Sequence, residues 1–255
     1  ILADLGIASE IIALKSGKDI KSNIEAQARE GRYEILSNYA KENNYDAVFL
    51  AHHQGDVLEN FFMRLSRGSG IDGLAKMREE IEINGVRFLR PLLEVEKLEL
   101  KQVLRENKIA WVEDPTNQNE EFLRNKVRKI LVELLPDELS KKRIIQTTEH
   151  CRRAQDFLQE QVIKSYTDLT HKENGHIMLL HQDFTALHEE LGLRLLLHIF
   201  SELTAYKYKP RFAKLQELYA KIYALNFNRQ LTFAHCLIKQ KKVDKKQYLI
   251  FSLEK

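Results

Sequence analysis

The stretch AHHQGDVLENFFMRLSRGSGIDGL, residues Ala51–Leu74, is the part of the sequence from which we predict the fold. It follows the apolar run Ala47–Leu50, which has the length and composition of a short buried strand. Two histidines come next, and Asp56 and Glu59 then lie three residues apart, on one face of the expected helix. A strand, a polar turn, an acidic helix start and a basic glycine turn are typical of ligand sites at strand ends in open α/β sheets.

Helical and strand-like segments alternate on both sides of this stretch. In chain order, the patterns predict a helix end at Ile1–Ile7, strands at Glu10–Leu14, Val86–Leu89 and Ile109–Val112, and helices at Ile24–Lys41 (with Asn23 as N-cap), Val95–Glu106 and Glu121–Leu134. Such alternation favours an α/β fold with a mostly parallel sheet. We therefore predict an α/β domain over residues 1–136, with a partial, doubly wound, mostly parallel sheet.

The composition changes after Pro136, and residues 137–255 predict a second, mainly helical domain with a small sheet. A long charged linker helix is expected from Asp137 to about residue 168. The following small α+β domain is expected to contain a strand at His176–Leu180, helices at Phe184–Leu203 and Pro210–Leu225, and a hairpin of Gln230–Lys239 and Gln247–Ser252 around the turn Lys241–Lys246.

The charge distribution indicates a polyanionic partner. Residues 205–255 hold twelve Lys or Arg and three Asp or Glu, a net charge of +9, which leaves −6 for residues 1–204 of a chain whose total is +3. A basic segment on a mildly acidic chain is typical of nucleic-acid binding. The alternative is a solvated lysine-rich surface.

The cysteines and the hydropathy of the chain indicate its cellular compartment. Cys151 and Cys236 are far apart and form no CxxC pair, so we expect a reduced, cytoplasmic protein. No apolar run reaches transmembrane length, and the first residues lack a signal-peptide pattern, so no membrane partner is expected.

The acidic helix start allows three chemical interpretations. Asp56 could hold Mg²⁺ beside a nucleotide's phosphates, because Mg²⁺ prefers oxygen ligands. Asp56 and Glu59 could instead bind the ammonium groups of a cationic substrate. The third interpretation is that Asp56 only caps the helix and favours its positive end. A zinc site is disfavoured, because His52 and His53 do not form an HExxH pattern.

Three other segments carry basic or glycine patterns. Arg67-Gly68-Ser69-Gly70 could bind an anion through backbone N–H groups, or it could simply end the helix. Arg124 and Arg128 share one helix face and could meet a phosphate or tRNA, or be solvated. Ser16-Gly17-Lys18-Asp19 has too few glycines for a phosphate loop and is expected to be an ordinary turn.

In this order, these segments resemble the tRNA(Ile)-lysidine synthases of the PP-loop ATPase superfamily. The resemblance covers nearly all of residues 1–136 and, more weakly, the arrangement of residues 137–255. Its motifs are Asn23-Ile24-Glu25-Ala26-Gln27-Ala28-Arg29 with Arg32-Tyr33, Ala51-His52-His53 with Asp56 and Glu59, Arg67-Gly68-Ser69-Gly70 with Gly73-Leu74, Arg90-Pro91-Leu92-Leu93, Asp114-Pro115-Thr116-Asn117, and Arg124-Asn125 with Arg128. The ordered set is far more specific than any one motif.

The resemblance implies a fold like that of the adenine nucleotide alpha hydrolases and an ATP-dependent ligase. Such enzymes adenylate C2 of the wobble cytidine in tRNA(Ile) with a CAU anticodon, and the amine of L-lysine then displaces AMP. ATP and Mg²⁺ are the implied co-substrate and metal, and a homodimer is the implied assembly.

The resemblance also implies roles for individual residues. Catalysis would involve His52, Asp56, Glu59, Arg32 and Arg124. Asp56 and Glu59 would bind lysine, and Asp56 would be the carboxylate near Mg²⁺. The nucleotide and its phosphates would meet Arg32, Arg67, Gly68, Ser69 and Gly70. The tRNA would meet Arg124, Arg128, Lys241, Lys242, Lys245 and Lys246.

The sequence departs from the family pattern in three places. The SGGxDS pyrophosphate loop does not occur in this sequence, so we expect this chain alone to be inactive. Gly55 stands where a second aspartate is usual, and Asn60 stands where a threonine is usual. The alternatives are therefore a non-catalytic tRNA-binding remnant and another PP-loop tRNA-modifying enzyme, such as a thiolation protein. The latter is disfavoured because both cysteines lie outside the catalytic stretch.

Overall fold

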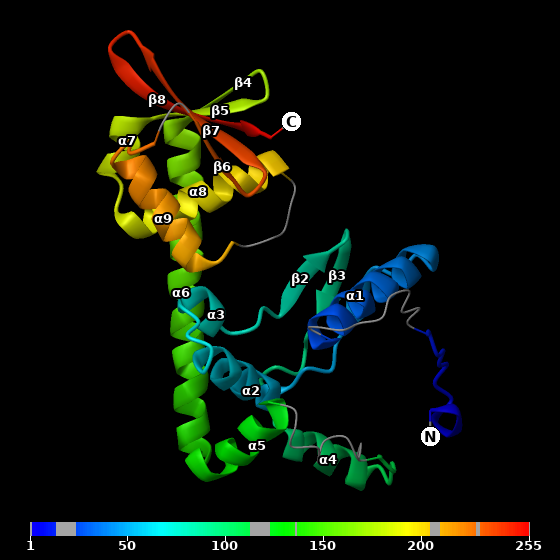
Figure 1. Ribbon diagram of the computed structural model, residues 1–255. Coiled ribbons are helices and arrows are strands. Elements are labelled where there is room, and N and C mark those ends of the chain that lie inside the picture. Colours follow the sequence, from blue (N-terminus) through cyan, green and yellow to red (C-terminus); the bar gives the residue numbers. More distant parts are fainter. Residues whose placement is uncertain are drawn as a thin grey trace. The chain divides into compact units, whose positions relative to one another are not determined.

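The computed structural model describes residues 2–13, 24–112, 123–135, 137–204, 210–227 and 230–254. The chain divides into two compact units, Ile1–Arg152 and Arg153–Lys255 (Figure 1). The division falls within one long helix, α6 (Glu138–Leu169), which contributes residues to both units.

The first unit contains a three-stranded sheet of order β1-β3-β2. Its strands are β1 (Ala47–Phe49), β2 (Glu80–Ile83) and β3 (Val86–Leu89). β1 runs parallel to β3, and β2 runs antiparallel to β3. Asn84 and Gly85 both have positive φ, which gives the two-residue turn that joins β2 and β3.

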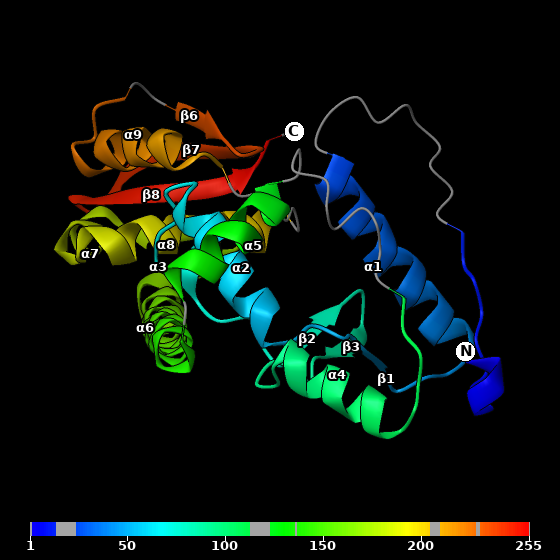
Figure 2. The ribbon, with the colours of Figure 1, turned by 90° about the horizontal axis from the view of Figure 1, so that it is seen from below.

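Helix α1 (Ile24–Glu42) packs on this sheet, as Figures 1 and 2 show. Ala40 of α1 lies in a buried cluster with Val86 and Phe88 of β3. A second cluster joins Leu58 of α2 to Leu135 and to Ile145 of α6. The unit's other helices are α2 (Gln54–Leu65), α3 (Ile71–Leu74), α4 (Lys97–Glu106), α5 (Leu123–Leu134) and the short 3₁₀ turn Ala3–Leu5.

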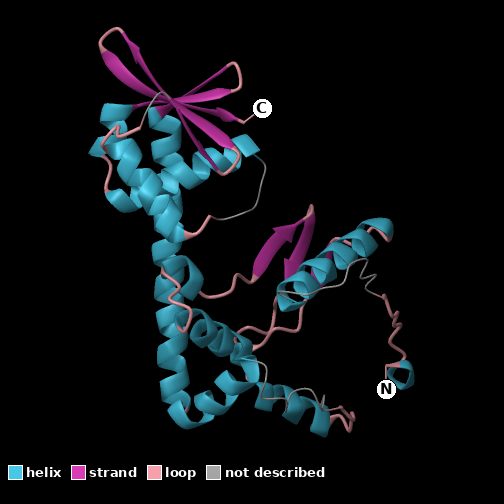
Figure 3. Ribbon diagram, viewed as in Figure 1, coloured by secondary structure: helices cyan, strands magenta, loops and turns pink. Residues whose placement is uncertain are grey.

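The second unit contains an antiparallel sheet of order β4-β5-β8-β7-β6. Its strands are β4 (Thr170–Glu173), β5 (His176–Leu180), β6 (Gln230–Phe233), β7 (Cys236–Val243) and β8 (Lys246–Leu253). Its helices, besides the end of α6, are α7 (His181–Ala186), α8 (Glu189–Thr204) and α9 (Phe212–Tyr223). Figure 3 shows these helices on one side of the sheet. Leu195, Leu196, Ile199 and Ile222 from them are fully buried in the core against the strands.

The structure confirms the predicted class, an α/β unit followed by a helical region with a small sheet. The mostly parallel, doubly wound sheet stays a prediction, because the sheet among the described residues of the first unit has one parallel and one antiparallel pairing. The bounds of four helices lie within a few residues of the predicted ones: α1, α4, α6 and α9. The same holds for the strands β1, β3 and β5. The turn Ser16–Asp19, the cap Asn23, the motif Asp114–Asn117 and Pro136 lie outside the described residues.

Two predicted strands are wrong. Glu10–Leu14 is described over residues 10–13, where it has no strand pairing and Ile11 is 98% exposed. Ile109–Val112 is also not a strand. Lys108 has positive φ, and the Ile109 N–H donates to the Leu104 carbonyl at 2.8 Å, so this segment caps the C-terminus of α4 instead.

Several details of the second unit also differ from prediction. The expected helix Phe184–Leu203 is interrupted after Ala186, because His188 Nδ1 accepts the Glu190 N–H at 3.2 Å and thereby starts a new helix. The expected single hairpin is two hairpins, since the two-residue turn Ala234-His235 divides the predicted first strand into β6 and β7.

The turn between β7 and β8 is shorter than predicted, and it consists of Asp244 and Lys245 alone. Lys241 and Lys242 therefore belong to β7, and Lys246 begins β8. Two short strands, β2 and β4, were not predicted.

Candidate functional site

The parallel pairing of β1 and β3 brings two chain segments to one edge of the first sheet. The N–H of Leu50, one residue beyond β1, donates to the carbonyl of Leu89, the last residue of β3, at 2.8 Å. His52 and His53 follow β1, and Arg90 follows β3, so these side chains leave the sheet from the same edge. Ligand sites of parallel sheets form at this edge.

His53 and Asp56 cap the start of α2. The Gly55 N–H donates to His53 Nδ1 at 3.0 Å, and the His53 N–H donates to Asp56 Oδ2 at 2.9 Å. These reciprocal bonds satisfy two of the N–H groups that a helix start leaves open. Asp56 therefore caps its helix, as the third interpretation held, but it does not only cap it, because it also bonds Arg124. A Cβ at Gly55 would lie 2.8 Å from His53 Cε1, so the capping ring occupies the space that a side chain there would need.

Asp56 and Glu59 also form ion pairs with α5. Arg124 bonds Asp56 through Nη2 and Glu59 through Nε, the latter at 2.5 Å. Arg128 Nε bonds the other oxygen of Glu59 at 2.6 Å. Asp56 is 9% exposed and Glu59 5%, whereas the side chains of Arg124 and Arg128 are 42% and 35% exposed. The four groups, called here the carboxylate–arginine cluster, balance in charge, and their open side consists of guanidinium groups.

His52 lies beside this cluster and is half-buried. Burial lowers the pKa of its imidazole; the charge of Asp56 opposes this, and the charges of Arg90, Arg29 and Arg124 lower the pKa further. Its Nδ1 atom is buried and has no hydrogen-bond partner in the described part of the chain. The neutral form of the ring is therefore favoured over the protonated form.

Arg90 is a buried cation that the sequence analysis did not single out as functional. It is 4% exposed and donates to the Arg78 carbonyl at 2.6 Å and to the Tyr33 hydroxyl at 3.3 Å. Arg29 donates to the same hydroxyl at 3.3 Å. The signal that could have found Arg90 is its position, since it follows β3 directly and precedes Pro91, as His52 follows β1.

The Arg67–Gly70 segment ends α2. Gly68 has φ 69°, and its N–H donates to the Leu65 carbonyl at 3.0 Å, so the helix-stop interpretation is confirmed. The segment is also cationic. Arg64 donates to Asn60 at 3.1 Å, and burial, with the charges of Arg29 and Arg67, lowers the pKa of the Arg64 guanidinium.

Other predicted site residues lie apart from these contacts. Arg32 is exposed on α1. Lys241, Lys242, Lys245 and Lys246 belong to the second unit.

No group of three or more His, Cys, Asp or Glu side chains within the described ranges is arranged to hold a metal ion. Both described cysteines are free thiols, and burial raises the pKa of Cys236 to about 11.

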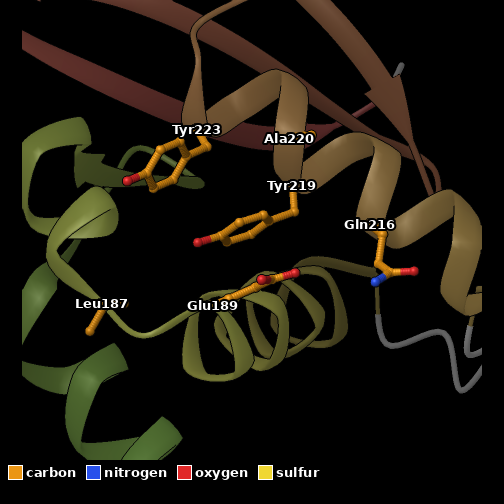
Figure 4. A pocket seen from close by; sticks show the side chains of 6 residues that line it. All are labelled: Leu187, Glu189, Gln216, Tyr219, Ala220 and Tyr223. Carbon is orange, nitrogen blue, oxygen red and sulfur yellow. The ribbon is translucent and has the colours of Figure 1, made fainter.

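The second unit has an open pocket of about 590 Å³, which Figure 4 shows. Tyr219 and Tyr223 of α9 lie side by side there, with ring centroids 5.8 Å apart, and Glu189 lies beneath Tyr219. Burial, followed by the charge of Glu189, raises the pKa of Tyr219. The remaining lining residues are Leu187, Gln216 and Ala220.

Residues 2–135 match the PP-loop domain family, which is a family of ATP-binding domains. This match covers more than half of the chain. The chain belongs to the PP-loop domain family.

The relatives of this PP-loop chain include curated tRNA(Ile)-lysidine synthases. The one from Wolbachia sp. subsp. Brugia malayi is 34% identical over 238 residues, which are 93% of this chain and 55% of the relative. The one from Ruegeria pomeroyi is 34% identical and covers 92% of this chain and 55% of the relative. The chain thus spans about half the length of the curated relatives it matches.

A solved U34-tRNA thiolase, NcsA from Methanococcus maripaludis, is 18% identical with a TM-score of 0.49, over 60% of this chain and 53% of that one. No helix in the described part of the chain combines the length and the apolar composition needed to cross a bilayer.

Proposed function

We propose that this chain takes part in joining L-lysine to C2 of the wobble cytidine in tRNA(Ile) with a CAU anticodon, with ATP converted to AMP and pyrophosphate. The observation that carries the proposal is the carboxylate–arginine cluster beside a histidine whose neutral form is favoured. It occurs in a PP-loop chain whose curated relatives are named for this product.

The cluster is chemically complementary to a free amino acid with a basic side chain. L-Lysine carries two ammonium groups and one carboxylate. Asp56 and Glu59 accept hydrogen bonds from ammonium groups, and the guanidinium of Arg124 or Arg128 donates to a carboxylate in a two-point geometry. Because the arginines are partly exposed and the acids are not, a lysine would reach the acids by displacing an arginine contact.

His52 is suited to receive a proton that lysine must lose. The attacking amine forms a C–N bond at C2, the bond from C2 to the oxygen that carries AMP breaks, and AMP leaves with that electron pair. Lysine bound as an ammonium ion loses two protons in all, one before its nitrogen can attack and one after the C–N bond has formed. A neutral imidazole can take the first, and the second goes to the departing phosphate or to water. Burial and the nearby Arg90, Arg29 and Arg124 favour the neutral imidazole.

The arginines around this edge would meet phosphates. Arg29 and Arg67 are close enough to Arg64 for their charges to lower its pKa, and the hydrogen-bond partners of Arg29 and Arg64, Tyr33 and Asn60, are uncharged. A bound phosphate would relieve this repulsion. We include Gly68, Ser69 and Gly70 in the same proposal, because they form the turn between α2 and α3. A phosphate contact of Arg32 rests on the family resemblance alone and stays a prediction.

The described residues do not fit a metal held by the protein alone. Asp56 already uses one oxygen for the His53 N–H and the other for Arg124. Mg²⁺ commonly relies on one or two carboxylates together with phosphates and water. We therefore propose no step through Mg²⁺, and Asp56 as its ligand stays a prediction. The homodimer, implied only by the resemblance, also stays a prediction.

The competing proposal is a tRNA-binding protein without catalysis. The deciding experiment measures ATP-dependent incorporation of radiolabelled lysine into a CAU-anticodon transcript, with a transcript lacking the wobble cytidine as control. We expect no incorporation by the 255-residue chain. We expect incorporation by a chimera that places the upstream segment of the Wolbachia relative before Ile1. A folded, tRNA-binding chimera without incorporation would favour the non-catalytic proposal.

A further inference from the structure

The two faces of the sheet in the second unit are chemically different. Alternate residues point inward, and Ile177, Leu179, Ile238, Leu249 and Phe251 are at most 2% exposed in the core. The residues between them point to the opposite side, which carries no helix in Figures 1 and 3. We call this side the open face.

The open face combines apolar, aromatic and basic side chains. Tyr248 and Ile250 of β8 lie at its centre and are half-buried, yet neither belongs to the core cluster. Lys241 is paired directly with Tyr248, and Lys239 with Ile250. Directly paired side chains have Cβ atoms about 5 Å apart, so each apolar group has an ammonium group beside it. Met178 of β5 pairs with Ile250 from the other side.

The charge of the open face is positive. Three lysines alternate with the core-facing residues and so lie on the open face: Lys239, Lys241 and Lys246. Among the residues of the five strands, only one acid lies on this face, Glu173 on the edge strand β4. Within the described residues, neither Lys239 nor Lys241 has a carboxylate within ion-pair distance. Lys242 has the opposite alternation and points to the other face.

We propose that the open face binds unpaired nucleotides of an RNA, with a base stacked on Tyr248 and the neighbouring phosphates on Lys239 and Lys241. An exposed ring on a sheet flanked by cations suits single-stranded RNA, because every base offers a flat face for stacking and every linkage offers an anion. A double helix hides its base faces and would leave the Tyr248–Ile250 surface unused. The proposal goes beyond the ligation site and rests on the proposed function only in taking RNA as the polyanion.

The test measures binding of a fluorescein-labelled, unstructured RNA ten nucleotides long to the full 255-residue chain by fluorescence anisotropy. Tyr248→Ala should weaken binding about tenfold or more, and Tyr248→Phe, which keeps the ring, should bind like the parent. Lys241→Gln should lower the slope of log K against log salt by about 0.7. Lys242→Gln is the matched control, with the same charge change on the same strand but the other face, and it should leave the slope unchanged.

Equal effects of Lys241→Gln and Lys242→Gln, or tighter binding of a duplex of the same length, would overturn the proposal. Loss of affinity on Tyr248→Phe equal to that on Tyr248→Ala would do the same. Concentration-dependent dimerisation abolished by Tyr248→Ala would assign the open face to a second copy of the chain instead. The assay contains neither lysine nor ATP, so its failure leaves the ligation proposal standing, and failure of ligation leaves this proposal standing.

Discussion

Arg124 illustrates how one side chain can join two parts of the site. It bonds both Asp56 and Glu59, which lie on one face of α2 but 65 or more positions before it in the chain. The three-residue spacing of the acids predicted their shared face. Their partner could not be read from spacing, because the contact depends on how α5 packs against α2.

Replacement of Arg124 by glutamine should destabilise the first unit. Removing one partner of a fully buried ion pair costs about 3–5 kcal/mol. Arg124 is 42% exposed, so screening by solvent reduces the expected loss in free energy of unfolding to about 1–2 kcal/mol. Urea unfolding measures it, with Lys126→Gln on an exposed position of the same helix as control. A loss no larger than that of the control would show that the acids do not need this partner.

His52 gives the site a defined pH dependence. Its pKa in the folded state is below the ordinary value of 6.5, so at mildly acidic pH the unfolded chain binds a proton that the folded chain does not. Stability should therefore fall as pH drops through 6.5 toward the folded-state pKa, and this loss should be smaller in His52→Gln. Urea unfolding between pH 5 and 7.5 tests this, with the exposed His150→Gln as control. A folded-state NMR titration of His52 with a midpoint at or above 6.5 would contradict the account.

At the scale of elements, the sequence predicted what depends on local periodicity and local turn chemistry. α1 and β3 were predicted because their apolar positions and flanking polar residues are local signals. β2 was missed although its residues alternate and Asn84-Gly85 follows it, a combination typical of a hairpin. Ala234-His235 carries no glycine or asparagine, so the turn between β6 and β7 had no such signal.

Gly192 of α8 gives an element-scale prediction. A Cβ there would lie 2.6 Å from Cε2 of Tyr219, whose ring is nearly buried on α9. Overpacking costs about 1–3 kcal/mol, whereas Gly→Ala within a helix gains about 1 kcal/mol. Gly192→Ala should therefore lower the free energy of unfolding, as urea denaturation would measure. A gain in stability would mean that the Tyr219 ring can move aside at little cost. If the clash causes the loss, combining Tyr219→Leu with Gly192→Ala should recover the lost stability.

At the scale of the whole molecule, the chain combines a PP-loop unit that carries the candidate lysine site with a second unit that presents a basic sheet face. The charge asymmetry along the sequence predicted the basic sheet face only in part. It located the lysines, but the strand pairing determines that Lys239 and Lys241 share a face with Tyr248 while Lys242 does not. The lysines of the predicted turn therefore fall into two groups, which a charge count cannot separate.

The central claim is that the carboxylate–arginine cluster receives lysine. In the chimera that carries the Wolbachia upstream segment, the most direct measurement compares the apparent KM values for lysine and for ATP in the parent and in Glu59→Gln. The account predicts that KM for lysine rises about tenfold or more while KM for ATP changes less than about twofold, because the proposal places Glu59 against the amino acid and not against the nucleotide. An unchanged KM for lysine, or equal increases for both substrates, would contradict it.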